Sequence, residues 1–138
     1  MGISVAAALL LRGHRVLWCG KDRSSATRLR ADSFNLVEMF SLEQLVSAAD
    51  VVISLCPPAE ALDVATQVAK AWVSVVRQAD ESHAAAGDDM IPPVYVDANG
   101  LSPRSVENMR AMLAENGLEA FVDACIIGPP GWDMGTTR

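Results

Sequence analysis

The residue types best suited to binding chemistry follow a short apolar run near the start of the chain. Lys21 and Arg23 flank Asp22 in a loop that comes directly after residues 15–19. Where the second strand of a dinucleotide-binding sheet ends, an arginine pairs with a 2′-phosphate, whereas an acidic side chain accepts a hydrogen bond from a ribose hydroxyl. The basic pair therefore favours a phosphate ligand. The alternative, which Asp22 supports and which applies to Lys21 more than to Arg23, is a solvated polar loop.

A glycine stands at the start of the first helical pattern. In a dinucleotide-binding loop the last glycine lets the helix pack closely on its strand, and the helix N-terminus offers free N–H groups to a pyrophosphate. Gly2 fits that last glycine, while the preceding strand and the two earlier glycines have no counterpart in the sequence. The alternative is an initiator methionine followed by a small residue.

Two later segments place polar groups where apolar runs end. Cys56, Pro57 and Pro58 follow residues 51–55, and Asn99 follows residues 94–97. Ligands of open α/β sheets bind at the carboxyl ends of the strands, so these segments are candidate ligand-binding loops. The alternatives are prolines that only begin the next helix and an asparagine that belongs to an ordinary Asn-Gly turn.

Short β-type runs alternate with helical runs along the whole chain. Strands are predicted at residues 15–19, 35–39, 51–56, 94–97 and 120–124. Helices are predicted at residues 4–12, 24–31, 41–48 and 59–76, and from 102 to the stop at 116–117. This alternation is typical of an α/β fold with a parallel sheet wrapped by helices. Residues 78–93, with acidic residues, glycine and paired prolines, are predicted to form a surface excursion.

The apolar positions of these elements predict how they pack. Residues 51–56 are nearly continuous β-branched and apolar sequence, which predicts an inner strand covered on both faces. The next helix should pack on the sheet through one stripe, and so should the helix that Ser102-Pro103 begins. The expected inward residues are Leu62, Ala65, Val68 or Ala69, Trp72 and Val76 in the first helix, and Val106, Met109 and Leu113 in the second.

Composition limits the class of protein. The chain has 138 residues, 51% of them hydrophobic and 20% charged, which is enough apolar material for the core of one soluble globular domain. Its 11 basic and 17 acidic residues give a net charge of −6, which argues against nucleic-acid binding.

Cysteine usage and targeting patterns indicate the cytoplasm. Cys19, Cys56 and Cys125 form no C-x-x-C pair and each closes an apolar segment, which predicts reduced core residues and no metal site. The apolar start, residues 3–11, is too short to span a bilayer, and no basic residue precedes it. A cytoplasmic protein without a membrane partner is therefore expected.

Four segments together resemble the cofactor domain of the β-hydroxyacid dehydrogenases, the group that contains 6-phosphogluconate and 3-hydroxyisobutyrate dehydrogenases. They are Met1-Gly2 with Gly13-His14-Arg15-Val16, and residues 50–58, 96–103 and 121–130. Each is weak alone, but their order and spacing are fairly specific, and the likeness covers nearly the whole chain. The resemblance implies a Rossmann-like doubly wound parallel sheet, NADP as cofactor with NAD as the alternative, and a small β-hydroxy acid as substrate.

The resemblance also implies roles for single residues. Arg23 matches the phosphate-facing arginine with Lys21 as support, and Asn99 would approach the nicotinamide ribose. Gly128 stands in the place of a Ser-Gly-Gly substrate loop, although Ile127 and Pro129 replace its flanking members and weaken substrate contact there. The cofactor-binding residues so implied are Gly2, Lys21, Arg23, Cys56, Pro57, Pro58 and Asn99, and Gly128 is the implied substrate-binding residue.

Two parts that the resemblance requires have no counterpart in the sequence. The first strand, central in the order 3-2-1-4-5-6, is missing before Gly2. The family's proton-transfer lysine lies on a helix beyond this domain, and neither Lys21 nor Lys70 matches it, so no catalytic residue is assigned. Residues 1–138 are therefore expected to be a single partial NADP-binding domain, a fragment of a longer oxidoreductase that lacks the helical C-terminal domain and is inactive alone.

Two other classes of function remain open. The first is a non-catalytic nucleotide-binding protein, which would bind NADPH without turning over a hydroxy acid. The second is an interaction protein whose central sheet edges recruit a partner by strand addition, or a second copy in a homo-oligomer. Only a nucleotide-binding protein should gain thermal stability from NADPH.

Overall fold

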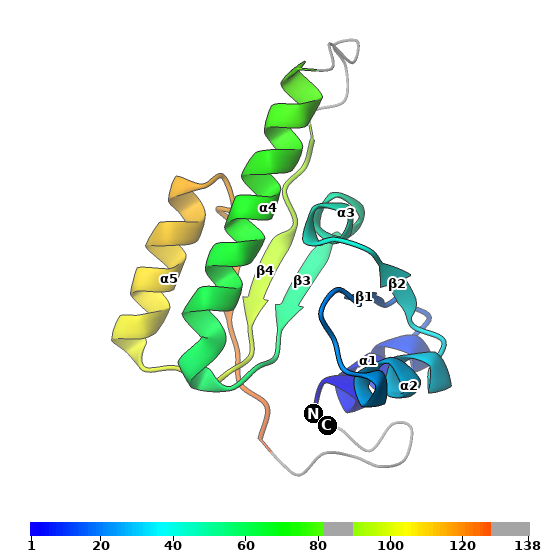
Figure 1. Ribbon diagram of the computed structural model, residues 1–138. Helices are drawn as coiled ribbons and strands as arrows, with labels where there is room; N and C mark the ends of the chain where they lie inside the picture. The colour runs from blue at the N-terminus through cyan, green and yellow to red at the C-terminus, as the bar shows by residue number, and fades with distance from the viewer. Residues whose placement is uncertain (82–89, 128–138) are drawn as a thin grey trace. The chain divides into compact units, whose positions relative to one another are not determined.

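The computed structural model describes residues 1–81 and 90–127, in which helices and strands alternate along the chain (Figure 1). The elements are α1 (Gly2–Leu11), β1 (Leu17–Cys19), α2 (Ser25–Ser33), β2 (Val37–Met39), α3 (Leu42–Ala48), β3 (Val51–Ser54), the 3-10 turn η1 (Pro58–Glu60), α4 (Ala61–Glu81), β4 (Val94–Asp97), α5 (Pro103–Glu115) and β5 (Phe121–Asp123). The chain divides into two compact units. The described residues of unit 1 are Met1–Ser41 and Ile127, and unit 2 is Leu42–Ile126.

Within the described part of the chain every strand pair is parallel, and the strands form two sheets. The first sheet has the order β1-β2 and the second β3-β4-β5. A doubly wound sheet of order 3-2-1-4-5-6 from which strand 1 is removed leaves these two groups, 3-2 and 4-5-6. The fold is therefore α/β and Rossmann-like, as predicted, and β1 and β3 each have one edge without a strand partner among the described residues.

Unit 1 consists of the β1-β2 sheet with α1 and α2. Alanine and leucine, which have high helix propensity, fill most of α1. The helix ends before Gly13, whose φ of +83° belongs to the left-handed region that glycine adopts without strain. The side chain of Ser24 caps α2 by accepting a hydrogen bond of 3.3 Å from the backbone N–H of Thr27.

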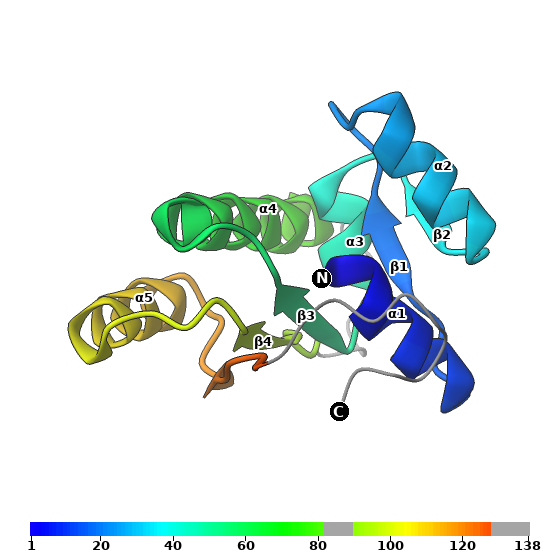
Figure 2. The same cartoon turned by 90° about the horizontal axis from the view of Figure 1, so that it is seen from below.

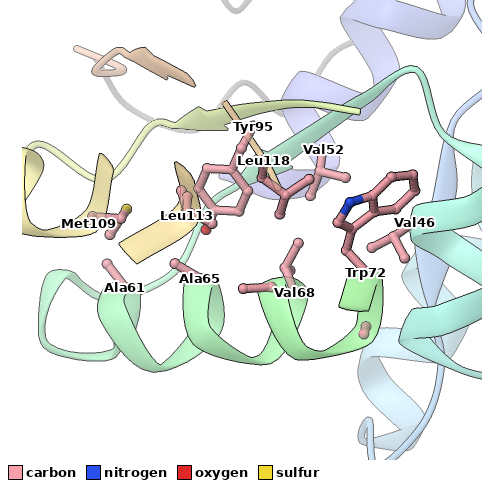
Figure 3. Close-up of a cluster of buried hydrophobic side chains, with 12 residues drawn as sticks. Val46, Val52, Ala61, Ala65, Val68, Trp72, Tyr95, Met109, Leu113 and Leu118 are labelled. Atoms are coloured by element: carbon pink, nitrogen blue, oxygen red, sulfur yellow. The ribbon is translucent and has the colours of Figure 1, made fainter. Parts of the chain in front are cut away.

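In unit 2, α4 and α5 lie on the same face of the β3-β4-β5 sheet (Figure 2), and α3 packs against α4. Figure 3 shows Val52 and Tyr95 of the strands pointing toward α4, with Val46 of α3 beside Trp72. The buried core of the unit is Val46, Val52, Ala61, Ala65, Val68, Ala69, Ala71, Trp72, Tyr95, Met109, Leu113 and Leu118. Burial of these side chains holds the helices and strands of unit 2 together.

The predicted stripes are mostly correct. Val106, Met109 and Leu113 of α5 are buried as predicted, and so are Ala65, Val68, Ala69 and Trp72 of α4. The prediction for Leu62 was wrong, because this side chain is 49% exposed and Ala61 takes the buried position instead.

The prediction that residues 51–56 form a strand covered on both faces was wrong. Val52 and Ser54 are buried under the helices, but Val51 and Ile53, on the opposite face, are 48% and 38% exposed. The reason is topological: β3 is an edge strand of its sheet, and α4 and α5 both lie on one face of that sheet. An apolar run does not specify which neighbours a strand finds.

Two smaller predictions also need correction. Helix α4 continues through Glu81, four residues into the predicted excursion 78–93, because exposed polar residues such as Gln78 and Asp80 are compatible with a solvent-facing helix. Cys125 is exposed, whereas Cys19 and Cys56 are half-buried, so Cys125 is not a core residue.

Candidate functional site

In unit 1, the candidate residues lie in the loop that follows β1. Lys21 and Arg23 are exposed, and neither forms an ion pair with any residue that the structure describes. Asp22 between them has a φ of 59°, in the left-handed region, and the Arg23 N–H donates to the Gly20 carbonyl at 3.3 Å. This tight loop leads directly into the N-terminus of α2, where backbone N–H groups favour a negative charge.

A third basic residue near this loop, Arg28, is bonded to other groups of the protein. The guanidinium of Arg28 donates to the Glu38 carboxylate and, at 2.5 Å, to the carbonyl of Gly20. It also lies 5.8 Å from the centre of the Trp18 ring, within the range of a cation–π contact. Arg28 therefore connects α2 to both strands, while Lys21 and Arg23 are left without an ion-pair partner among residues 1–81 and 90–127.

Gly2 is exposed and is the first residue of α1. A Cβ added at this position would meet no other atom within 4 Å. The described residues therefore give no steric reason for a glycine here, and its place in a pyrophosphate loop stays a prediction. The N-cap Met1 provides no side-chain hydrogen bond to α1.

In unit 2, Asn99 joins the loops that follow β3 and β4, whose carboxyl ends lie at the same edge of the sheet (Figure 1). Its Nδ2 donates to Asp97 Oδ1 at 2.6 Å and to Ser54 Oγ at 3.0 Å, and its Oδ1 accepts from the Cys56 N–H at 2.7 Å. These partners fix the orientation of the amide, because a carboxylate only accepts and a backbone N–H only donates. Both amide hydrogens are used within the protein, so Asn99 can offer a ligand only the second lone pair of Oδ1.

The prolines that follow Cys56 begin the next helical segment. Pro58 is the first residue of η1, and Pro57 precedes it in extended conformation with ψ of 138°. This is the helix-initiation role that the sequence left open for them. Both prolines are exposed, while the half-buried Cys56 thiol lies 3.8 Å from Ser54 Oγ. Contact of Cys56, Pro57 or Pro58 with a cofactor stays a prediction.

Sequence reasoning missed the buried polar residues Tyr95 and Asp97. Both are 0% exposed, and the Asp97 carboxyl group accepts hydrogen bonds from Asn99. Burial raises the pKa of Tyr95 to about 12; nearby Ser54 opposes this in part, although the two hydroxyls do not meet the geometry of a hydrogen bond. The sequence did contain a signal for this burial: Tyr95 and Asp97 alternate with valines in the strand, and residues two apart lie on the same face of a sheet.

The hollow described in unit 2 does not contain the candidate residues. A hollow of about 470 Å³ lies at the opposite end of unit 2, lined in part by Trp72, Arg77, Met90 and Asn116. Gly128, the predicted substrate-binding residue, is not among the described residues. Within residues 1–81 and 90–127, no group of His, Cys, Asp and Glu is arranged to hold a metal ion, and no helix is long and apolar enough to cross a membrane.

Comparison with known proteins finds similarity to solved structures. No protein-family model matches the chain, and no curated protein matches it. The conserved protein MTH1747, of unknown function and described as structurally similar to 3-hydroxyacid dehydrogenases, aligns with a TM-score of 0.65, 26% identity, and coverage of 92% of this chain and 40% of its own. A conserved hypothetical protein from Sinorhizobium meliloti 1021 aligns with a TM-score of 0.66 and 22% identity over 93% of this chain and 38% of its own. The chain thus shares a Rossmann-like fold with a dehydrogenase-like structure and spans about two fifths of each neighbour's length.

Proposed function

We propose that this chain binds the adenosine 2′-phosphate of NADP as part of a dehydrogenase of the β-hydroxyacid type. The observation that carries the proposal is the loop after β1, where the exposed Lys21 and Arg23 have no ion-pair partner among the described residues. The loop ends at Ser24, which caps a nine-residue helix. Two unpaired cations beside a helix N-terminus are suited to a dianionic phosphate.

The adenosine end of the cofactor fits these residues better than the nicotinamide end does. The loop after β1 offers free donors, whereas the amide hydrogens of Asn99 are already bonded to Asp97 and Ser54. In this proposal Asn99 holds the loops after β3 and β4 in place, and its second Oδ1 lone pair is its remaining contact for the nicotinamide ribose. When bound, NADP would supply hydride-transfer chemistry, and this chain's residues bind and orient it.

We also propose that this chain is one domain of a longer enzyme. Both units would belong to one nucleotide-binding domain, 1–138, of a longer cytoplasmic oxidoreductase, with a small β-hydroxy acid as substrate. The similarity of the neighbour MTH1747 to 3-hydroxyacid dehydrogenases supports this reading. A helical domain outside this sequence would supply the proton-transfer lysine and dimer contacts, as the family resemblance implies, so the isolated chain should bind nucleotide without turnover.

Titration of the purified chain with NADPH and NADH against its thermal unfolding tests this function. Saturation with NADPH at one hundred times its Kd should stabilise the folded chain by about 2.7 kcal/mol. Replacing both Lys21→Gln and Arg23→Gln should weaken NADPH binding at least about tenfold and leave NADH binding within about twofold. The matched control is Arg12→Gln with Arg15→Gln, which removes two exposed cations outside the loop. The absence of a thermal shift with either nucleotide, or equal loss in the control, would overturn the proposal.

The free edge of β3 favours a second candidate function, partner recruitment by strand addition. Hydrogen bonds from Val94 N–H to Asp50 O and from Ala98 N–H to Ser54 O show which alternate residues face β4. The backbone groups of Val51 and Ile53 therefore point to the open edge. This candidate requires an oligomer in sedimentation that Ile53→Lys dissociates, together with no stabilisation by NADPH. A monomer that NADPH stabilises would reject it.

A further inference from the structure

The carboxylate of Glu38 occupies the position of a side chain that the neighbouring strand lacks. Gly20 follows β1 and has no side chain, and a Cβ added there would overlap the Glu38 carboxyl group. Glu38 belongs to β2, where it pairs in register with Trp18 of β1. An acidic group thus lies at the end of β1, although residues 17–21 contain no acidic residue.

This position decides the charge that faces the adenosine ribose in a dinucleotide-binding sheet. In such sheets a carboxylate at the end of the second strand, to which β1 corresponds here, accepts a hydrogen bond from the ribose 2′-hydroxyl. The same carboxylate repels a 2′-phosphate. If Lys21 and Arg23 receive the 2′-phosphate, Glu38 adds an opposing charge from the adjacent strand. Its side chain is 33% exposed, so part of the group lies at the surface where a ribose could approach.

Arg28 sets the effective charge of this carboxylate. Its guanidinium donates to Glu38 Oε1 and, through the other terminal nitrogen, to the Gly20 carbonyl. The guanidinium also lies 5.8 Å from the centre of the Trp18 ring, within the range of a cation–π contact. The pair keeps a carboxylate at the end of β1 with much of its charge balanced, whereas a glutamate without Arg28 would present a full negative charge.

We propose that Glu38 is a specificity-determining residue. Its negative charge lowers the preference of the site for a 2′-phosphate over a free 2′-hydroxyl, and Arg28 limits this effect. The assignment rests on the proposed nucleotide-binding function. Two substitutions that break the same ion pair then have opposite effects on selectivity. Glu38→Gln removes the repulsive charge, and Arg28→Gln exposes it. A purely structural pair would instead cause the same loss of stability in both variants and no opposed change in selectivity.

The test compares 2′,5′-ADP with 5′-AMP, which isolates the adenosine end of the cofactor. Dissociation constants are measured by NMR titration of the full 138-residue chain, with the preference expressed as the ratio of the two constants. Glu38→Gln should raise the preference for 2′,5′-ADP about fivefold and Arg28→Gln should lower it about fivefold, with both changes shrinking at high salt. Asp32→Asn and Arg15→Gln, which change the same charges at exposed positions of unit 1, should leave the ratio within about twofold.

The outcomes separate this inference from the function on which it rests. If neither probe binds the wild-type chain, the proposed function and the role of Glu38 are both rejected. If both probes bind and the Lys21 and Arg23 variants weaken 2′,5′-ADP, but the two pair variants leave the ratio unchanged or shift it in the same direction, only the Glu38 assignment fails. Circular dichroism of each variant confirms that a change in ratio is measured on folded protein.

Discussion

The loop after β4 in unit 2 and the loop after β1 in unit 1 both carry polar side chains at the carboxyl end of a strand, yet they use them differently. In unit 2, the side-chain amide of Asn99 donates hydrogen bonds to Ser54 and Asp97 and accepts one from the Cys56 N–H. In unit 1, Lys21 and Arg23 form no ion pair with any described residue. The first loop holds the fold together and the second remains open to a ligand.

Burial explains this difference. Ser54 and Asp97 are 4% and 0% exposed, so their polar groups need partners within the protein, because an unsatisfied buried group is costly. Lys21 and Arg23 are exposed and solvated by water, which a phosphate can displace. A polar residue at the ligand edge of a sheet is therefore a binding candidate only to the extent that its donors are not already used.

The largest expected effect comes from removing the amide that joins the loops of unit 2. Asn99→Ala should lower the free energy of unfolding by about 2–4 kcal/mol, because the buried Asp97 carboxyl group and the Cys56 N–H each lose a hydrogen-bond partner. Urea unfolding followed by circular dichroism measures the change. The matched control is Asn108→Ala, at an exposed position of α5, which should change stability by about 0.5 kcal/mol or less. If the two substitutions cost the same, the loop after β4 is not held by Asn99 and the contrast with unit 1 disappears.

Tyr95 provides a pH-dependent test of the same buried region. Its pKa of about 12 in the folded chain lies above the ordinary value of 10.0, so the folded state binds the phenolic proton more tightly than the unfolded state does. This contribution to stability is complete below pH 10 and is lost as the pH rises toward 12, by roughly 2–3 kcal/mol in total.

Because the chain contains a single tyrosine, tyrosinate absorbance reports the pKa of Tyr95 directly. Tyr95→Phe removes a hydroxyl that has no hydrogen-bond partner among the described residues, so stability at neutral pH should be unchanged or slightly higher, and the alkaline loss should become smaller. An ordinary pKa near 10 would show that the hydroxyl reaches solvent, and Tyr95 would then not belong to the buried polar region of unit 2.

Local sequence determined the helix ends well, because capping acts within a few residues. Ser102 and Pro103 begin α5, and Asn116 ends it before Gly117, whose φ is +84°. The α/β alternation was predicted for a similar reason, from the spacing of the apolar runs, whereas the division of the strands into two sheets emerged only from the structure.

The candidate site was less predictable, because its contacts join residues distant in sequence. Asn99 contacts Cys56 and Ser54, 43 and 45 residues away, and Glu38 reaches Gly20 only because β1 and β2 pair. The same limit explains the exposed Val51 and Ile53, since their covering depends on tertiary neighbours that an apolar pattern does not specify. Sequence placed candidate residues at strand ends but did not reveal which of them were already bonded.

The smallest expected effect comes from replacing the helix N-cap residues, which are equivalent in the two units. Ser24 and Ser102 each accept a hydrogen bond from the backbone N–H three residues later, at 3.3 and 3.2 Å. Replacing either by alanine should cost about 1 kcal/mol of helix stability, and Ser→Thr at each site should restore most of it.

The consequences of the two replacements should differ, because α5 buries Val106, Met109 and Leu113 while α2 buries only Ala31 among its residues. Ser102→Ala should lower the stability of unit 2 as a whole and leave 2′,5′-ADP binding unchanged. Ser24→Ala should increase amide hydrogen exchange mainly in the first turn of α2 and weaken 2′,5′-ADP binding, since that turn adjoins the loop of Lys21 and Arg23. Weaker nucleotide binding in Ser102→Ala, with none in Ser24→Ala, would place the ligand at unit 2 and reverse the assignment of the two loops.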